Sequence, residues 1–294
     1  MPQNELEERA REAVSRLKSC EICPRHCRVN RLNDEKGFCP GERHARIYSY
    51  APHFGEEPPL VGTHGSGTIF LSGCNMVCVF CQNYEISQLD QGTKVRSVGL
   101  ATTMIKLQDL GCHNINLVTP THFVPQILEA LIPARQMGLT VPLVYNSSGY
   151  DSVETLRLLE GIFDIYMPDI KYGSDEMAIK YSNAPEYTKF AKGAILEMHR
   201  QVGDLVIDEN GLAARGLLVR HLVLPEGAAG TEQVVRFLSK RVSKNTYLNV
   251  MAQYRPEHLA CGYSEINRPI SVQEYKEAAR MAADAGLTRG LDIY

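Results

Sequence analysis

Three cysteines, Cys74, Cys78 and Cys81, stand in a C-x3-C-x2-C run directly after the apolar stretch 68–71. This spacing brings three thiolates into one small volume, in a polar loop that begins with a glycine. Cubic iron–sulfur clusters are normally held by four cysteines. Three ligands leave one iron without a protein ligand, and an open coordination position is typical of metal sites that react. The run therefore predicts a catalytic [4Fe-4S] site.

A second set of cysteines precedes the first. Cys20, Cys23, Cys27 and Cys39 form a C-x2-C-x3-C-x11-C pattern. A complete set of four ligands indicates a closed site, which suits structure or electron transfer. Tetrahedral zinc and a second iron–sulfur cluster both fit the spacing. We favour the cluster, because reductive chemistry at the neighbouring loop needs an electron route, and zinc stays open as the alternative.

The composition is typical of a globular protein from a reducing compartment. The chain has 294 residues, of which 44% are hydrophobic, so it can bury a large core. Nine cysteines behind a polar, charged start point to metal ligation rather than disulfides. The net charge of −3 gives no nucleic-acid signal, and no apolar run is long enough to span a membrane. We therefore expect a cytoplasmic protein with no membrane association.

The elements that must position these cysteines alternate between strand and helix patterns. Strand-like apolar runs are expected at 68–71, 114–119, 141–145, 164–168, 217–224 and 247–251. Helical patterns are expected at 5–18, 99–110, 124–137, 152–160, 185–201, 231–242 and 271–285. A helix before each apolar strand is the pattern of a parallel sheet covered by helices.

The number of these units sets the expected architecture. Six strand–helix units are fewer than the eight of a full TIM barrel, so the α/β fold expected is a partial (β/α)6 barrel. The barrel and a C-terminal helix are expected at 63–294. An N-terminal helix and the four-cysteine module are expected before them, at 1–62.

The cysteine run, with the aromatic Phe80 just before Cys81, resembles the radical S-adenosylmethionine (radical SAM) superfamily. The surrounding sequence is most similar to uncharacterised iron–sulfur proteins related to pyruvate formate-lyase activating enzyme. The resemblance implies an oxidoreductase whose open iron binds the amine and carboxylate of S-adenosylmethionine. It implies that an electron from the cluster cleaves the sulfonium to methionine and a 5′-deoxyadenosyl radical, which abstracts hydrogen from a substrate. Phe80 near the adenine and an electron donor such as flavodoxin or ferredoxin are implied as well.

In such barrels the chemistry gathers at the C-terminal ends of the strands. The second expected strand ends in Thr119-Pro120-Thr121-His122, where many superfamily members carry a Gly-Gly-Glu that holds the amine of S-adenosylmethionine. The hydroxyls of Thr119 and Thr121 offer acceptors in its place. His122 is a candidate substrate contact, with packing as the alternative.

The next two strand ends carry polar residues that resemble motifs of the activating enzymes. Asn146 stands in a segment similar to their Thr-Asn-Gly, and Asp169-Ile170-Lys171 is similar to their Asp-Leu-Lys. The resemblance implies that Asp169 and Lys171 approach the carboxylate and ribose end of S-adenosylmethionine, Lys171 as the cation for the carboxylate. A simple ion pair between the two is the structural alternative.

The last two strand ends supply further candidates. Arg220-His221 resembles the Arg-His-x-x-x-Pro segment that helps to frame the nucleoside in the same relatives. Arg255 and His258 follow the sixth strand and are candidate substrate contacts by location. Arg255 could equally pair with Glu257 on the surface.

These patterns leave three functions open. The hydrogen donor is a glycine of a partner protein, as in the activating enzymes, or it is a small molecule or another macromolecule. The third function is a non-catalytic electron-transfer or redox-sensing protein with two clusters. An electron carrier needs no missing fourth ligand, so the catalytic functions are favoured over it. The sequence does not separate the first two, because the cofactor carries the chemistry whatever the substrate.

Overall fold

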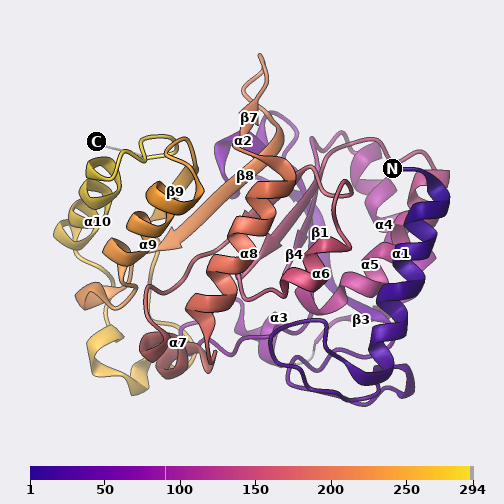
Figure 1. Ribbon diagram of the computed structural model, residues 1–294, viewed down its shortest axis with the longest axis horizontal. Coiled ribbons are helices and arrows are strands. Elements are labelled where there is room, and N and C mark those ends of the chain that lie inside the picture. Colours follow the sequence, from indigo (N-terminus) through magenta and orange to yellow (C-terminus); the bar gives the residue numbers. More distant parts are fainter. Residues whose placement is uncertain (90, 292–294) are drawn as a thin grey trace.

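Six parallel strands form the centre of the molecule, and helices cover their outer side (Figure 1). The computed structural model describes residues 1–89 and 91–291. The strands pair in parallel in chain order. They are β2 (Ser66–Leu71), β4 (Ile115–Val118), β5 (Leu143–Ser147), β6 (Ile165–Pro168), β8 (Ala213–Leu222) and β9 (Tyr247–Met251). The six strands expected from the apolar runs are all present, with ends that differ by a few residues, and the α/β fold class is confirmed.

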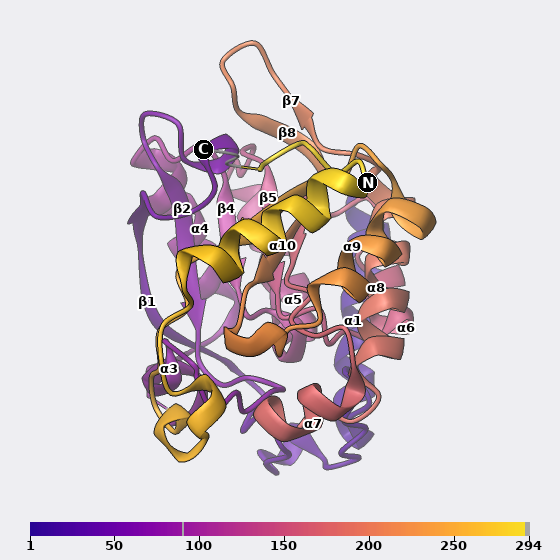
Figure 2. The ribbon, with the colours of Figure 1, turned by 90° about the vertical axis from the view of Figure 1, so that its left-hand side faces the viewer.

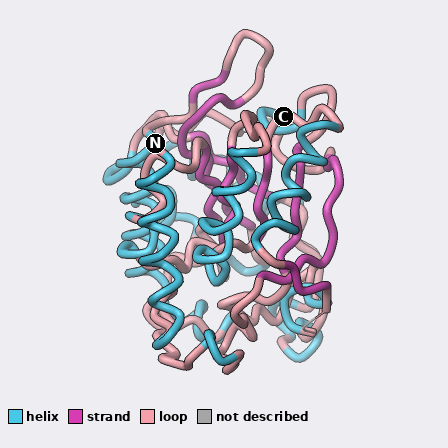
Figure 3. The backbone as a smooth tube through the Cα atoms, turned by 90° about the vertical axis from the view of Figure 1, so that its right-hand side faces the viewer, coloured by secondary structure: helices cyan, strands magenta, loops and turns pink. Residues whose placement is uncertain are grey.

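Antiparallel strands extend this sheet at both sides. β1 (Ala45–His53) pairs with β2, and β3 (Thr93–Val95) pairs with β1. β7 (Val206–Ile207) and β8 form a hairpin that projects from one end of the molecule (Figure 3). β1 was not expected from the sequence, because the second half of this strand is largely exposed and shows no apolar alternation.

The expected helices lie where the amphipathic patterns place them. They are α1 (Gln3–Ser15), α4 (Ser97–Asp109), α5 (Val124–Gln136), α6 (Val153–Arg157), α8 (Tyr187–Val202), α9 (Thr231–Phe237) and α10 (Val272–Asp284). α10 begins with a capping box between Ser271 and Glu274, and it lies in front of α9 in Figure 2. Short helices were not expected at α2 (Pro58–Val61), α3 (Tyr84–Gln88) and α7 (Asp175–Ser182). No helix in the described ranges is long and apolar enough to cross a bilayer.

The alternation of side chains along the strands explains how the inner face becomes polar. Val144, Met167 and Leu218 belong to a small apolar cluster inside the curved sheet. Side chains two positions apart on a strand share a face. Two residues further along the chain stand Asn146, Asp169 and Arg220, which therefore emerge on the same inner face at the C-terminal ends of β5, β6 and β8.

The N-terminal cysteine-rich segment lies at that same end of the molecule. Figure 1 shows the indigo loops that follow α1 close to the end at which α3 and α7 lie, opposite to the β7–β8 hairpin. α1 packs against α5 on the outside of the barrel. A domain boundary at residue 62 stays a prediction.

Candidate active site

The cysteine loop leaves β2 through a turn that requires glycine. Gly73 has φ +84°, and a Cβ atom there would lie 2.5 Å from the carbonyl oxygen of Cys39. Its N–H donates to the carbonyl oxygen of Ile86 at 2.9 Å. Only glycine adopts this conformation at this distance without strain, so the turn fixes the direction in which Cys74 enters the site.

The three cysteines of the loop share one cavity. Cys74, Cys78 and Cys81 all line a cavity of about 160 Å³ at the C-terminal ends of the strands. Each sulfur has a polar neighbour: Met76 N–H at 3.3 Å from Cys74 Sγ, Ser182 Oγ at 2.9 Å from Cys78 Sγ, and Ser87 Oγ at 3.2 Å from Cys81 Sγ. Burial raises the pKa of the Cys78 thiol to about 11, against the opposing charge of Lys171. The loop thus presents three sulfurs to one enclosed volume.

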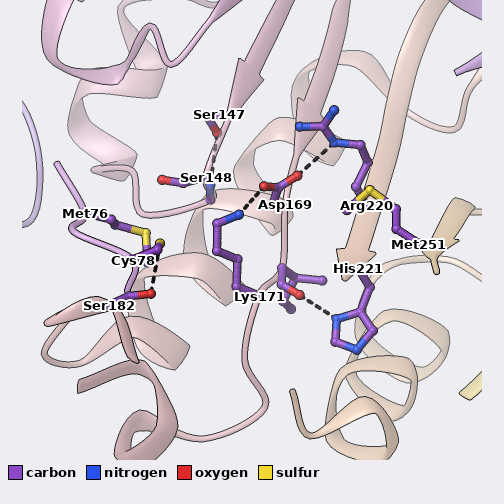
Figure 4. A network of polar contacts seen from close by, with 12 residues as sticks. Met76, Cys78, Ser147, Ser148, Asp169, Lys171, Ser182, Arg220, His221 and Met251 are labelled. Atoms are coloured by element: carbon purple, nitrogen blue, oxygen red, sulfur yellow. Dashed lines mark hydrogen bonds and ion pairs between the residues drawn. The ribbon is translucent and has the colours of Figure 1, made fainter. Parts of the chain in front are cut away.

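A charged network forms another part of the wall of this cavity. The Nε atom of Arg220 donates to Oδ1 of Asp169 at 2.8 Å, and Nη2 of Arg220 donates to Oδ1 of Asn146 at 2.7 Å. Lys171 Nζ donates to the other carboxylate oxygen of Asp169 at 2.5 Å (Figure 4). All four side chains line the cavity that the cysteines share. The predicted residues at the ends of β5, β6 and β8 are therefore brought together.

Asp169, which is buried, and Lys171, which is half-buried, both keep their charges. Burial by itself would raise the pKa of Asp169, but the charges of Arg220 and Lys171 outweigh it and hold this pKa below its usual value. Burial would lower the pKa of Lys171, but the carboxylate of Asp169 outweighs it and raises this pKa. A carboxylate and an ammonium group, both ionised at neutral pH, thus lie beside the cysteines.

Two acidic residues that the sequence analysis missed complete this network. Glu56 Oε2 lies 3.5 Å from Nη1 of Arg220, and Glu57 Oε1 lies 3.9 Å from its Nε. Burial raises the pKa of Glu56, with the charge of Arg220 acting against it. The two residues stand in the loop between β1 and α2, away from the C-terminal ends of the parallel strands. Only the adjacent acids of the segment GEEPPL could have drawn attention to them.

Hydroxyl groups add polar positions to the cavity. Thr119 lines it with φ +58°, a left-handed conformation that is costly for a β-branched residue and that clusters at functional sites. Ser148 also lines it, and its buried Oγ has no hydrogen-bond partner among the described residues. Such an atom marks a place where a polar ligand would fit.

Several predicted cofactor contacts point elsewhere. Thr121 Oγ1 donates to Oδ1 of Asp151 at 2.7 Å in the core. Phe80, which is 5% exposed, packs edge-on against Tyr172 and Tyr254 and does not line the cavity of the cysteines. Roles for these side chains at the nucleoside stay predictions.

The two buried histidines each have backbone partners. His221 Nδ1 lies 2.6 Å from the carbonyl oxygen of Ile170, and its Nε2 lies 3.0 Å from Oγ1 of Thr231. Because a carbonyl only accepts, Nδ1 carries the proton and Nε2 accepts from the hydroxyl. Burial lowers the pKa of His221 to about 4 and that of His122 to about 3. Both imidazoles are therefore neutral, and His122 lines the cavity of the N-terminal cysteines instead of the active-site cavity.

The late candidates lie outside the cavity. Arg255, whose side chain is 64% exposed, pairs with Glu257 at 2.8 Å, which is the surface alternative considered for it. His258 stacks on Tyr84 with ring centroids 4.6 Å apart. Neither lines the cavity of Cys74, and substrate roles for them stay predictions.

Neither cysteine set converges on one ion. Within residues 1–89 and 91–291, no group of three or more His, Cys, Asp or Glu side chains is placed to hold a single metal ion. The cysteines of each set nevertheless share a cavity, Cys74 with its two partners in one and the four N-terminal cysteines in the other. The donor set of the first cavity, three thiols and no fourth, fits a cubic cluster with one open iron.

The fold is that of radical SAM enzymes. The structure is similar to that of a radical SAM methyltransferase from Sphaerobacter thermophilus, with a TM-score of 0.52 and 15% sequence identity. The match covers 76% of this chain and 65% of that one, so the likeness concerns the fold alone. The radical SAM fold expected from the cysteine run is thus present.

The sequence shows which family the chain belongs to. It is 32% identical over 285 residues to the uncharacterized protein MJ0674 of Methanocaldococcus jannaschii, covering 95% of this chain and 78% of that protein. The chain therefore belongs to the family of MJ0674. A second protein of the same organism, MJ0808, is 26% identical over 173 residues, which is 53% of this chain and 50% of that protein. No protein-family model matches the chain.

Proposed function

We propose that the chain is a radical SAM enzyme that holds a [4Fe-4S] cluster on Cys74, Cys78 and Cys81 and cleaves S-adenosylmethionine reductively. The observation that carries this proposal is that the three sulfurs share a cavity with the charged pair Asp169 and Lys171. A three-cysteine site needs a ligand from outside the protein, and a charged wall beside it suits a zwitterionic one.

The polar neighbours of the sulfurs support a bound cluster. The hydroxyl of Ser182 and the backbone N–H of Met76 are donors that would stabilise thiolate ligands. When bound, such a cluster supplies the electron that cleaves the sulfonium to methionine and a 5′-deoxyadenosyl radical.

The charged network would hold the methionine part of S-adenosylmethionine. Lys171 keeps its ammonium charge because Asp169 lies against it, and that charge would bind the carboxylate of S-adenosylmethionine. Arg220 accordingly serves as a positioning residue, since it holds Asp169 from the opposite side. It also occupies Oδ1 of Asn146, which leaves the amide nitrogen of Asn146 as a donor. The hydroxyl of Ser148, buried and without a partner in the described chain, would bind a polar group of S-adenosylmethionine.

The motifs at the strand ends suggest an activating type of enzyme, in which the hydrogen donor is a glycine of a partner protein. This finer assignment depends on the similarity of Asn146, of Asp169 and Lys171, and of Arg220 to the activating enzymes. One observation favours a small molecule instead. Residues after β9 cover the cysteine loop, with Leu259 N–H donating to the carbonyl oxygen of Val79 at 2.8 Å. A covered loop leaves less room for a protein segment than an open one.

The cleavage itself is tested with anaerobically reconstituted protein, a reductant and S-adenosylmethionine. We expect release of 5′-deoxyadenosine, measured by chromatography, and its loss in Cys78→Ala. Cys261→Ala is the matched control, because this cysteine is exposed and belongs to neither set. Undiminished release from Cys78→Ala would refute the assignment. With candidate donors deuterated in turn, the one that transfers deuterium into 5′-deoxyadenosine is the substrate, which separates a partner glycine from a small molecule.

A further inference from the structure

A second cavity lies inside the N-terminal segment, and its wall combines four thiols with cationic side chains. Cys20, Cys23, Cys27 and Cys39 all line it. Arg25, Arg31 and His122 line the same cavity. One buried nitrogen in each of these three side chains has no hydrogen-bond partner in the described chain: Arg25 Nη2, Arg31 Nε and His122 Nδ1.

Arg31 is a buried cation that has no carboxylate partner among the described residues. Its side chain is 1% exposed, and its guanidinium donates to the carbonyl oxygens of His122 at 2.7 Å and Glu42 at 3.1 Å. It also lies 3.8 Å from the sulfur of Cys20. None of its hydrogen bonds within the described residues goes to a carboxylate. A buried charge that lacks a counter-charge is strongly destabilising, so a negative group is expected next to it.

Arg25, which is half-buried, lines another side of the cavity. Its Nε donates to the carbonyl oxygen of Asn75 at 2.8 Å, and its guanidinium lies over the ring of Phe38, 3.6 Å from the centroid. Its contacts in the described ranges also include no carboxylate. Four cysteine thiolates around a metal centre would supply the negative charge that Arg25 and Arg31 lack.

The spare donors favour a cluster over zinc. A zinc ion with four thiolates offers only the cysteine sulfurs as acceptors, and one of these already accepts from a backbone amide, Phe38 N–H to Cys27 Sγ at 3.4 Å. A cubic cluster adds bridging sulfides as acceptors for Arg25 Nη2 and Arg31 Nε. Gly37 supports close packing on this side, because a Cβ atom there would lie 3.0 Å from the sulfur of Cys27.

The residues around this cavity contact the backbone on both sides of Cys74. His122 Nε2 lies 2.8 Å from the carbonyl oxygen of Ser72, and Arg25 holds the carbonyl oxygen of Asn75. Between them, the carbonyl oxygen of Cys39 lies against Gly73 so closely that no Cβ atom fits. The backbone at positions 72, 73 and 75, on both sides of Cys74, thus contacts residues around the N-terminal cavity.

We infer that Cys20, Cys23, Cys27 and Cys39 hold a second [4Fe-4S] cluster, which passes electrons to the cluster of Cys74 through these contacts. Zinc has no redox chemistry and would make the contacts only structural. One electron from an external one-electron donor of the ferredoxin or flavodoxin class reduces the N-terminal cluster. That electron then moves to the cluster of Cys74 and ends in the cleaved sulfonium, and no bond forms or breaks in the N-terminal segment itself.

The metal is tested in a variant that cannot cleave S-adenosylmethionine, so that this inference and the proposed function can fail separately. We expect Cys74/Cys78/Cys81→Ala, isolated anaerobically, to keep about four irons and about four sulfides per chain, with the Mössbauer spectrum of a cubic cluster. One zinc per chain, or no metal, would overturn the inference.

The role of the cationic wall is tested in the same background. Arg25→Gln removes a positive charge next to the cluster, which disfavours the reduced state, so we expect a lower midpoint potential in a redox titration followed by electron paramagnetic resonance. Arg28→Gln is the matched control, because Arg28 is exposed and pairs with Glu21 at 2.8 Å. Equal potentials in the two variants would contradict the placement of the cluster.

The relay is tested in the chain with all three active-site cysteines intact. With reduced ferredoxin, we expect the double variant Cys20→Ala/Cys23→Ala to form at least about tenfold less 5′-deoxyadenosine than the parent. With titanium(III) citrate, we expect a much smaller decrease. Cys112→Ala, a buried cysteine outside both sets, should behave as the parent with both reductants. Equal losses with the two reductants would show that the N-terminal segment only holds the loop, and would overturn the relay.

Discussion

The guanidinium of Arg220 donates from Nε to Oδ1 of Asp169 at 2.8 Å, although the two residues lie 51 positions apart in the chain. The contact joins the ends of β6 and β8, where the two residues also form an isolated bridge. Because the same guanidinium reaches Asn146, one side chain fixes the polar ends of three strands. The geometry of the charged wall therefore depends on Arg220.

Arg220→Lys is expected to weaken the binding of S-adenosylmethionine. A lysine keeps the charge but cannot hold Asp169 and Asn146 at once, so the carboxylate that positions Lys171 becomes mobile. We expect the dissociation constant for S-adenosylmethionine of the cluster-loaded protein to rise at least about tenfold, which is about 1.4 kcal/mol. The constant is measured by anaerobic equilibrium dialysis. Arg215→Lys on the same strand is the control, since Arg215 contacts the carbonyl oxygen of Val202 outside the site. Equal affinities in the two variants would contradict this role.

Ser182→Ala is expected to make the active-site cluster harder to reduce. The hydroxyl of Ser182 donates to the sulfur of Cys78 at 2.9 Å, and a hydrogen bond to a ligand sulfur stabilises the reduced, more negative cluster. We therefore expect a lower midpoint potential and slower release of 5′-deoxyadenosine with a weak reductant, while the iron content stays the same. Ser264→Ala changes an exposed serine and should leave the potential as it is. An unchanged potential in Ser182→Ala would show that this hydroxyl does not act on the cluster.

His221 is expected to make stability depend on pH below neutrality. Burial lowers its pKa from 6.5 to about 4 in the folded chain, so the unfolded chain binds one more proton between these values. The stability that the neutral His221 contributes is fully present above pH 6.5. It is lost as the pH decreases towards 4, by up to about 1.4 kcal/mol per pH unit for this one group.

The measurement is the pH dependence of the thermal unfolding midpoint between about pH 4.5 and 7, in the parent and in His221→Asn. The variant should be less stable at neutral pH and should lose stability less steeply on acidification. His64→Asn, at an exposed position, should keep the slope of the parent. The same slope in His221→Asn as in the parent would rule out a neutral buried imidazole at this position.

Gly149→Ala is expected to displace Asp169. A Cβ atom at Gly149 would lie 2.2 Å from the carbonyl oxygen of Asp169, and the residue has φ +75°. Gly161 has φ +74° with nothing within 4 Å of its Cβ position, so Gly161→Ala measures the backbone cost alone. We expect Gly149→Ala to be less stable than Gly161→Ala by about 1–3 kcal/mol in urea unfolding, and to lose cleavage activity. Equal stabilities would mean that the backbone at Asp169 yields without cost.

The local patterns of the sequence were enough for the central part of the fold. The six parallel strands were predicted because apolar runs and helical periodicity are properties of neighbouring residues. The same reasoning placed Asp169, Lys171 and Arg220 near one another, since the C-terminal ends of parallel strands meet at one edge. β1 was not predicted, because its pairing with β2, and not an apolar pattern in its own sequence, makes it a strand.

The sequence by itself determined which residues carry chemistry: two cysteine sets of different completeness, and charged residues at the ends of strands. Only the tertiary structure decided how they are used. It turned Thr121 towards Asp151 and His122 towards the N-terminal cysteines, and it brought Glu56 to Arg220. These contacts join residues far apart in the chain, and no local periodicity records them, because they arise only when separate elements pack together.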